Sequence, residues 1–88
     1  LQAWEQLVRK IRDVAASNIP ASPRRTARAL VEELERREII DHSLAASIDD
    51  LGRLRNSVAH AEYRPSRSEA VAYVNSVARV DAALNTLL

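Results

Sequence analysis

The sequence predicts an all-α protein whose helices form an antiparallel four-helix bundle. Only one Gly and three Pro occur in its 88 residues, which leaves little room for hairpins. No stretch alternates apolar and polar residues as a half-buried strand does, whereas apolar residues recur at helical spacing nearly throughout. Four such patterns joined by short connections favour an antiparallel bundle. The length fits a single domain, residues 1–88, and the start at Leu1 leads us to expect a fragment of a longer, multidomain polypeptide.

The first helix is predicted over residues 2–17. Its apolar residues have the i, i+3, i+4, i+7 spacing of one buried face. This stripe consists of Trp4, Leu7, Val8, Ile11 and Ala15. Pro20 lies in the loop that follows and prevents the helix from continuing.

The second helix is expected to begin with Ser22 as its N-cap and Pro23 in the first helical position, where a missing N–H costs nothing. The helical pattern fades near Glu38, and we expect Ile39 and Ile40 to fill the core at the turn. The apolar stripe of this helix consists of Ala27, Leu30, Val31 and Leu34.

The third helix is predicted to start at Asp41 or Ser43 and to end between residues 59 and 61. Its apolar face is shared by Leu44, Ile48, Leu51, Arg55 and Val58. The fourth helix follows a capping box, in which Ser66 and Glu69 each satisfy a backbone donor near the other. It is expected to reach the chain end, and its stripe consists of Ala70, Tyr73, Val74, Val77, Val80, Leu84 and Leu87.

The composition excludes several kinds of site. The absence of Cys rules out disulfides, thiol catalysis and thiolate zinc sites. Two His residues without a carboxylate cluster argue against a metal, and we interpret Asp49 and Asp50 as surface charge paired with Arg53, so we expect no metal and no cofactor. The formal net charge of +1 gives no global attraction for nucleic acid. No apolar run approaches a membrane span and no signal peptide is visible, so we expect a cytoplasmic segment without membrane contact.

Residues 55–60, with the sequence Arg-Asn-Ser-Val-Ala-His, carry the strongest chemical signal. Arg55 is a permanent cation with a fork of donors, and His60 is of the type that titrates near neutral pH. Arg55 lies at the edge of an apolar stripe, and no acid stands three or four residues away, so it needs a distant acid or an anionic ligand. Asn56 stands four residues before His60 and can reach the imidazole if the helix persists that far. The spacing alone leaves an ordinary alternative open: an arginine bonded to a carbonyl or core acid, and a histidine at the helix C-cap.

This segment resembles the signature of the HEPN superfamily, which is an Arg, a polar residue, a few variable positions and a His. The likeness includes Leu54, Pro65 after the motif, and the Glu-Ala and Tyr-Val pairs of residues 69–70 and 73–74. It extends to an early Trp in an amphipathic first helix and to residues 34–41, Leu-Glu-Arg-Arg-Glu-Ile-Ile-Asp. The chain looks most like the HEPN-like domains that are appended to larger prokaryotic proteins.

The resemblance implies a helical bundle that forms a homodimer, often with the Arg and His of both copies in a shared cleft. Many HEPN domains are metal-independent endoribonucleases of toxin–antitoxin, antiviral-defence or RNA-processing systems. By that resemblance, Arg55 would stabilise the scissile phosphate and His60 would transfer a proton while the ribose 2′-hydroxyl attacks. Asn56 would occupy the polar position. Some HEPN domains have lost catalysis, so the alternative is a non-catalytic dimerisation or regulatory module of a larger protein.

Basic residues near the motif and at the start of the second helix are candidate RNA contacts. Tyr63 is an aromatic residue that can stack on a base or pack against the protein. The candidate RNA-binding set is Arg24, Arg25, Arg28, Tyr63, Arg64 and Arg67. A solvated face is the alternative for each arginine. A helix-turn-helix DNA-binding protein is a third possibility, which the net charge and the lack of a recognition helix oppose.

Small residues recur every seven positions on the third helix, at Ala45, Gly52 and Ala59. Gly inside a helix costs about 1 kcal/mol relative to Ala, so Gly52 has a packing reason. Two explanations stay open. The stripe is either an internal crossing with the first or fourth helix, or a dimer interface that brings two Arg55–His60 pairs together.

Overall fold

The computed structural model describes residues 2–20, 25–60, 62 and 64–88. Within these ranges the chain forms four helices and no strand, so the all-α prediction is confirmed. The helices are α1 (Gln2–Asn18), α2 (Ala27–Arg36), α3 (His42–Ala59) and α4 (Arg67–Asn85). None of these described helices is long and apolar enough to cross a membrane.

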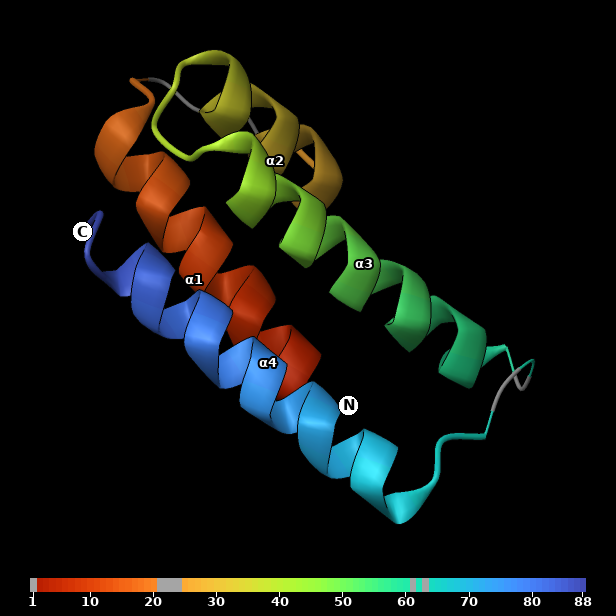
Figure 1. Cartoon of the computed structure of the whole chain (residues 1–88). Coiled ribbons are helices and arrows are strands. Elements are labelled where there is room, and N and C mark those ends of the chain that lie inside the picture. Colours follow the sequence, from red (N-terminus) through yellow and green to blue (C-terminus); the bar gives the residue numbers. More distant parts are fainter. Residues whose placement is uncertain (1, 21–24, 61, 63) are drawn as a thin grey trace.

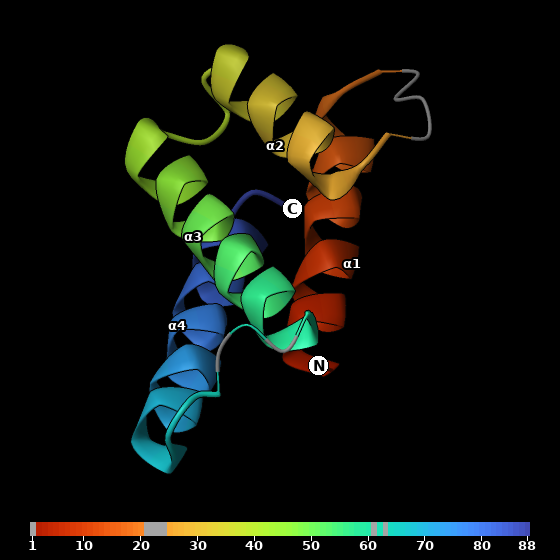
Figure 2. The same cartoon turned by 90° about the vertical axis from the view of Figure 1, so that its right-hand side faces the viewer.

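Helices α1 and α4 lie side by side and run in the same direction, while α3 runs opposite to both (Figures 1 and 2). The end of α1 meets the end of α4, where the Asn18 side chain donates to the Leu87 carbonyl at 3.1 Å. An antiparallel arrangement was expected, and the α1–α4 pair departs from it. The reason is that α2 has only ten residues and forms a corner between α1 and α3, as Figure 2 shows.

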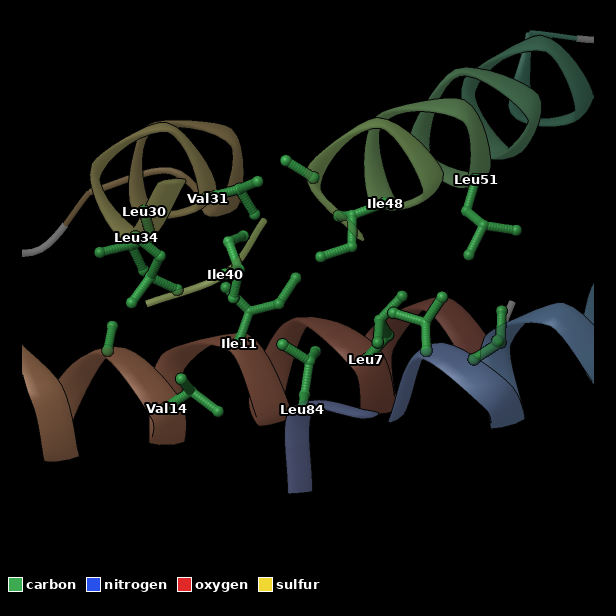
Figure 3. Close-up of a cluster of buried hydrophobic side chains, with 14 of the residues drawn as sticks. Leu7, Ile11, Val14, Leu30, Val31, Leu34, Ile40, Ile48, Leu51 and Leu84 are labelled. Atoms are coloured by element: carbon green, nitrogen blue, oxygen red, sulfur yellow. The ribbon is translucent and has the colours of Figure 1, made fainter. Parts of the chain in front are cut away.

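The core lies between α1 and the other three helices. Leu7, Ile11 and Val14 of α1 are fully buried, with Leu84 of α4 beside them (Figure 3). Ile40 is also buried, which confirms its predicted place at the turn. The remaining buried apolar residues are Ala15, Ile19, Leu30, Val31, Leu34, Ala45, Ile48, Leu51, Val77 and Val80.

The first half of α4 is more exposed than its apolar stripe predicts. Val71 and Val74 are each 54% exposed, and Ala70 is also exposed, whereas Val77 is buried. The predicted burial of Ala70 and Val74 is therefore wrong for the single chain. The physical reason is visible in Figure 2, where the first turns of α4 extend beyond the start of α1.

Helix α2 begins later than predicted, after Thr26. The Thr26 side chain caps the helix by accepting the Ala29 N–H at 3.1 Å. Ser22 and Pro23 lie outside the described residues, but Arg25 and Thr26 precede the helix, so the predicted start is wrong. Arg12 of α1 donates to the Arg25 carbonyl at 2.9 Å, which holds this backbone outside the helix.

The turn from α2 to α3 is closed by local backbone bonds around Glu38. This residue has φ 60°, a left-handed conformation usually taken by Gly. The Glu38 N–H donates to the Glu35 carbonyl at 2.9 Å, and the Ile39 N–H donates to the Leu34 carbonyl at 2.9 Å. These bonds form a Schellman motif, which directs Ile39 and Ile40 back onto the core.

A buried carboxylate of α2 pairs with arginines before the helix, in its last turn and at its C-cap. Glu33 is 7% exposed and forms ion pairs with Arg25 at 3.4 Å, with Arg37 at 2.6 Å, and with Arg36. We call these four residues the Glu33 cluster. The cluster ties the segment before α2 to the segment after it. Sequence reasoning gave Glu33 no role, although arginines three and four residues after a glutamate on a helix are a recognisable signal.

Candidate functional site

The motif residues occupy the last turn of α3. Asp41 caps the start of this helix by accepting the Leu44 N–H at 2.8 Å, and His60 is its C-cap residue. Both predicted ends of the helix are confirmed. The helix therefore stops at the point where the motif ends, which leaves His60 exposed.

Arg55 is half-buried and has no acidic partner among the described residues. Its Nη1 donates to the Asn56 Oδ1 at 3.3 Å, a long hydrogen bond to a neutral group. No carboxylate of the described chain lies within ion-pair distance of the guanidinium. By contrast, Arg53 forms the predicted pair with Asp49, at 3.0 Å.

Tyr73 of α4 lies close to Arg55. Burial raises the pKa of Tyr73, and the nearby Arg55 charge acts in the opposite direction and lowers it. The Tyr73 hydroxyl is shielded from solvent and has no hydrogen-bond partner in the described structure. Such a group is uncommon, because buried polar atoms are almost always paired. Sequence reasoning placed Tyr73 in the apolar stripe and did not foresee its contact with the motif arginine.

His60 closes the helix through its backbone. Its N–H donates to the Asn56 carbonyl at 2.9 Å. Within the described part of the chain, no hydrogen bond joins the Asn56 and His60 side chains, and the Asn56 amide oxygen accepts from Arg55 instead. The expected orientation of the imidazole by Asn56 is therefore not seen in the single chain.

Arg55 borders an apolar hollow of about 430 Å³, which we call the Arg55 hollow. Helices α1, α3 and α4 and the segment before α4 contribute its walls. The lining residues are Ala3, Gln6, Leu54, Arg55, Val58, Pro65, Glu69, Ala70, Tyr73 and Val74. Glu69 is engaged in the confirmed capping box, where its carboxylate accepts the Ser66 N–H at 2.9 Å.

Asn56 lines a different hollow, between α2 and α3, together with Arg28, Trp4 and Gly52. His60 lines neither of these two hollows. The structure therefore brings Arg55 and Asn56 into contact but directs the three motif residues toward different surfaces. His42, which also lines the second hollow, is exposed at the start of α3 and contacts Glu35 at 2.9 Å.

The candidate RNA-binding arginines fall into two groups. Arg25 belongs to the Glu33 cluster, and Arg28 pairs with Glu32 at 3.5 Å, so both already have acidic neighbours. Arg64 and Arg67 are exposed near the motif and have no ion pair with a described carboxylate. Arg24 and Tyr63 lie outside the described residues.

The small-residue stripe of α3 is used inside the chain over most of its length. Ala45 is buried, and Gly52 faces Trp4 of α1, where an added Cβ would lie 3.0 Å from the indole ring. The packing reason for Gly52 is therefore the internal crossing. Ala59 is exposed, beside His60.

Among the described residues, no group of His, Cys, Asp and Glu side chains is arranged to hold a metal ion. No protein-family model matches the chain, and neither a curated protein nor a solved structure does.

Proposed function

We propose that this domain is a metal-independent endoribonuclease of the HEPN type, which acts as a homodimer in a toxin, antiviral-defence or RNA-processing system. The observation that carries the proposal is Arg55. Its guanidinium is half-buried at the end of α3, within the Arg-polar-x3-His motif, and has no acid among the described residues. An anionic ligand is the natural complement of such a group, because a half-buried charge without a partner is unfavourable.

The proposed chemistry uses RNA itself as the source of the nucleophile. The ribose 2′-hydroxyl attacks the adjacent phosphorus, and the 5′-oxygen of the next nucleotide leaves. Arg55 donates to the phosphate oxygens as their negative charge increases. His60 transfers a proton at the attacking or the leaving oxygen, and it is solvent-accessible for that purpose. The need for a 2′-hydroxyl confines the activity to RNA.

A dimer would bring together the Arg55 and His60 side chains of two copies. In the single chain, Arg55 lines the Arg55 hollow and His60 lines neither this hollow nor the one between α2 and α3, so neither hollow, as the described residues form it, holds both motif side chains. We place the dimer contact at Ala59, the exposed member of the small-residue stripe, because a second copy there would bring two motifs together. Arg64 and Arg67 would then contact the RNA backbone on either side.

The test is incubation of the domain with mixed RNA in EDTA. Arg55→Gln and His60→Ala should each lower the cleavage rate at least about 100-fold. Arg53→Gln and His42→Ala are matched controls, since each alters the same residue type on α3 outside the motif, and both should cleave like the parent chain. Absence of cleavage, or cleavage that survives His60→Ala, would refute the enzyme.

A non-catalytic dimerisation or regulatory module is the second candidate. The observation that favours it is the divergence of Arg55, Asn56 and His60 toward different surfaces of the single chain. This candidate predicts a stable dimer without RNA cleavage, in which Arg55→Ala changes folding or assembly only. Both candidates predict that the parent chain sediments as a dimer and that Ala59→Glu weakens the dimer. A parent chain that sediments as a monomer would contradict both.

A further inference from the structure

The Arg55 hollow combines apolar walls with two polar groups that lack an acidic partner. Most of its lining side chains are aliphatic, and Val74 remains 54% exposed at its edge. Its volume of about 430 Å³ falls in the range of small-molecule pockets. The hollow therefore has the size and wall chemistry to take an apolar body.

The two polar groups are both hydrogen-bond donors. Arg55 donates only a 3.3 Å bond to the Asn56 amide, and the Tyr73 hydroxyl has no partner in the described structure. Arg55 and Tyr73 both line the Arg55 hollow, from α3 and α4 respectively. Arg55 is half-buried, so its long side chain retains room to adjust. A small turn of the Tyr73 ring would open its shielded hydroxyl to the hollow. Among the described residues, one of these donors has a single long bond to a neutral acceptor and the other has none, so both suit an anionic oxygen ligand. A carboxylate offers two acceptor atoms.

We propose that the Arg55 hollow binds a medium-chain aliphatic carboxylate, with the alkyl chain between α1, α3 and α4 and the carboxylate on Arg55 and the Tyr73 hydroxyl. An alkyl chain suits these walls better than a peptide, because a peptide would bring backbone N–H and C=O groups that the aliphatic lining cannot satisfy. The other polar groups of the lining are Gln6 and Glu69, and Glu69 is engaged by the Ser66 N–H at 2.9 Å.

Binding of a carboxylate at Arg55 does not require that the domain cleave RNA. A carboxylate on Arg55 would withhold that side chain from a phosphate, so the same ligand would inhibit the proposed nuclease. The binding measurement contains no RNA, and His60→Ala should bind the carboxylate like the parent chain. The failure of one proposal can therefore be distinguished from the failure of the other.

The experiment is a titration of the 88-residue chain with octanoate, followed by NMR shifts and calorimetry. Octanol and acetate are the ligand controls, because one keeps the alkyl chain without the charge and the other keeps the charge without the chain. We expect octanoate to bind at least tenfold more tightly than either. The shifted amides should belong to residues that line the Arg55 hollow.

Two variants test the donors separately. Arg55→Gln should weaken octanoate at least tenfold and leave octanol unchanged, while Arg53→Gln, whose guanidinium pairs with Asp49, should bind octanoate like the parent chain. Tyr73→Phe should weaken octanoate several-fold. Thermal unfolding of each variant shows whether it is folded, so a loss of binding by a folded variant is attributable to the lost donor.

Several results would overturn the proposal. Equal binding of octanol and octanoate would show that the donors do not recognise a charge. Unchanged octanoate binding by Arg55→Gln would place the ligand elsewhere. Tighter, Arg55-dependent binding of a short peptide with a C-terminal leucine would assign the hollow to a chain terminus. A dimer that Val74→Asp dissociates, together with no octanoate binding, would assign it to a second copy.

Discussion

The two ends of the bundle differ in whether their arginines are paired with an acid. At the end formed by α2, three guanidiniums surround Glu33, which is only 7% exposed, and the neighbouring Leu34 is fully buried. At the end formed by the last turns of α3 and the first turns of α4, Arg55 lacks an acid among the described residues and borders an apolar hollow. The first end satisfies its own charges, as a structural ion cluster does. Among the described residues, the second end leaves donors without an acidic partner and apolar side chains exposed, which is typical of a binding surface. We call the first end the closed end and the second the open end.

The largest difference in stability between the two ends should come from truncating apolar side chains on α4. Leu84 is fully buried at the closed end, so Leu84→Ala should lower the free energy of unfolding by about 2–5 kcal/mol. Val74 is 54% exposed at the open end, so Val74→Ala should change it by less than about 0.5 kcal/mol. Urea denaturation measures both. A large loss in Val74→Ala would mean that a partner covers the open end.

Removing the charge of Glu33 should also lower the free energy of unfolding. Glu33→Gln replaces charge-assisted bonds to three arginines and should lower the free energy of unfolding by about 2 kcal/mol. The estimate is moderate because the three guanidiniums are themselves partly exposed to solvent. Glu32→Gln is the matched control, since Glu32 forms only an exposed pair with Arg28, and it should cost less than about 0.5 kcal/mol. Similar losses in the two variants would remove the distinction between the ends.

A substitution at Gly52 tests the crossing of α1 and α3, which lies between the two ends. Gly52→Leu should lower the free energy of unfolding by about 1–3 kcal/mol, because even a Cβ would lie 3.0 Å from Trp4. Trp4→Leu in the same chain should recover part of the loss. Sedimentation should show an unchanged oligomeric mass, and a lower mass would restore Gly52 to the dimer interface.

The smallest effect concerns the unpaired hydroxyl of the open end. Tyr73→Phe should raise the free energy of unfolding of the free chain by about 1 kcal/mol, because it removes a buried group that has no partner among the described residues. Since burial raises the pKa of Tyr73, the unfolded chain ionises first at alkaline pH. The stability of the parent chain should therefore fall as the pH rises above 10, and Tyr73→Phe should lose this part of the decline. Destabilisation by Tyr73→Phe at neutral pH would contradict the missing partner.

Local signals in the sequence predicted most of the helix boundaries. Asp41, Ser66 and Glu69 act within one helical turn, so their caps depend on neighbouring residues alone. The start of α2 was predicted wrongly because Ser22 and Thr26 are both suitable caps. The choice between them involves Arg12, which contacts the Arg25 carbonyl from another helix.

The candidate site was predictable only in part, because it also depends on contacts between helices. Helical spacing excludes a local acid near Arg55, and this holds in the structure. The proximity of Tyr73 depends on how α4 packs beside α3, and single-sequence periodicity carries no such information. Spacing also permitted a contact between Asn56 and His60, but the Asn56 amide instead accepts from the adjacent Arg55.

The parallel pairing of α1 and α4 has a consequence for how the chain acquires its structure. Lys10 bonds to Asn85 and Asn18 bonds to Leu87, across 75 and 69 positions respectively. The α2–α3 turn, by contrast, closes through bonds within six residues. Since distant contacts require the closure of long loops, we expect the turn to form early and the α1–α4 pairing late. A chain emerging from the ribosome would then expose the part of α1 that packs against α4 until α4 is complete.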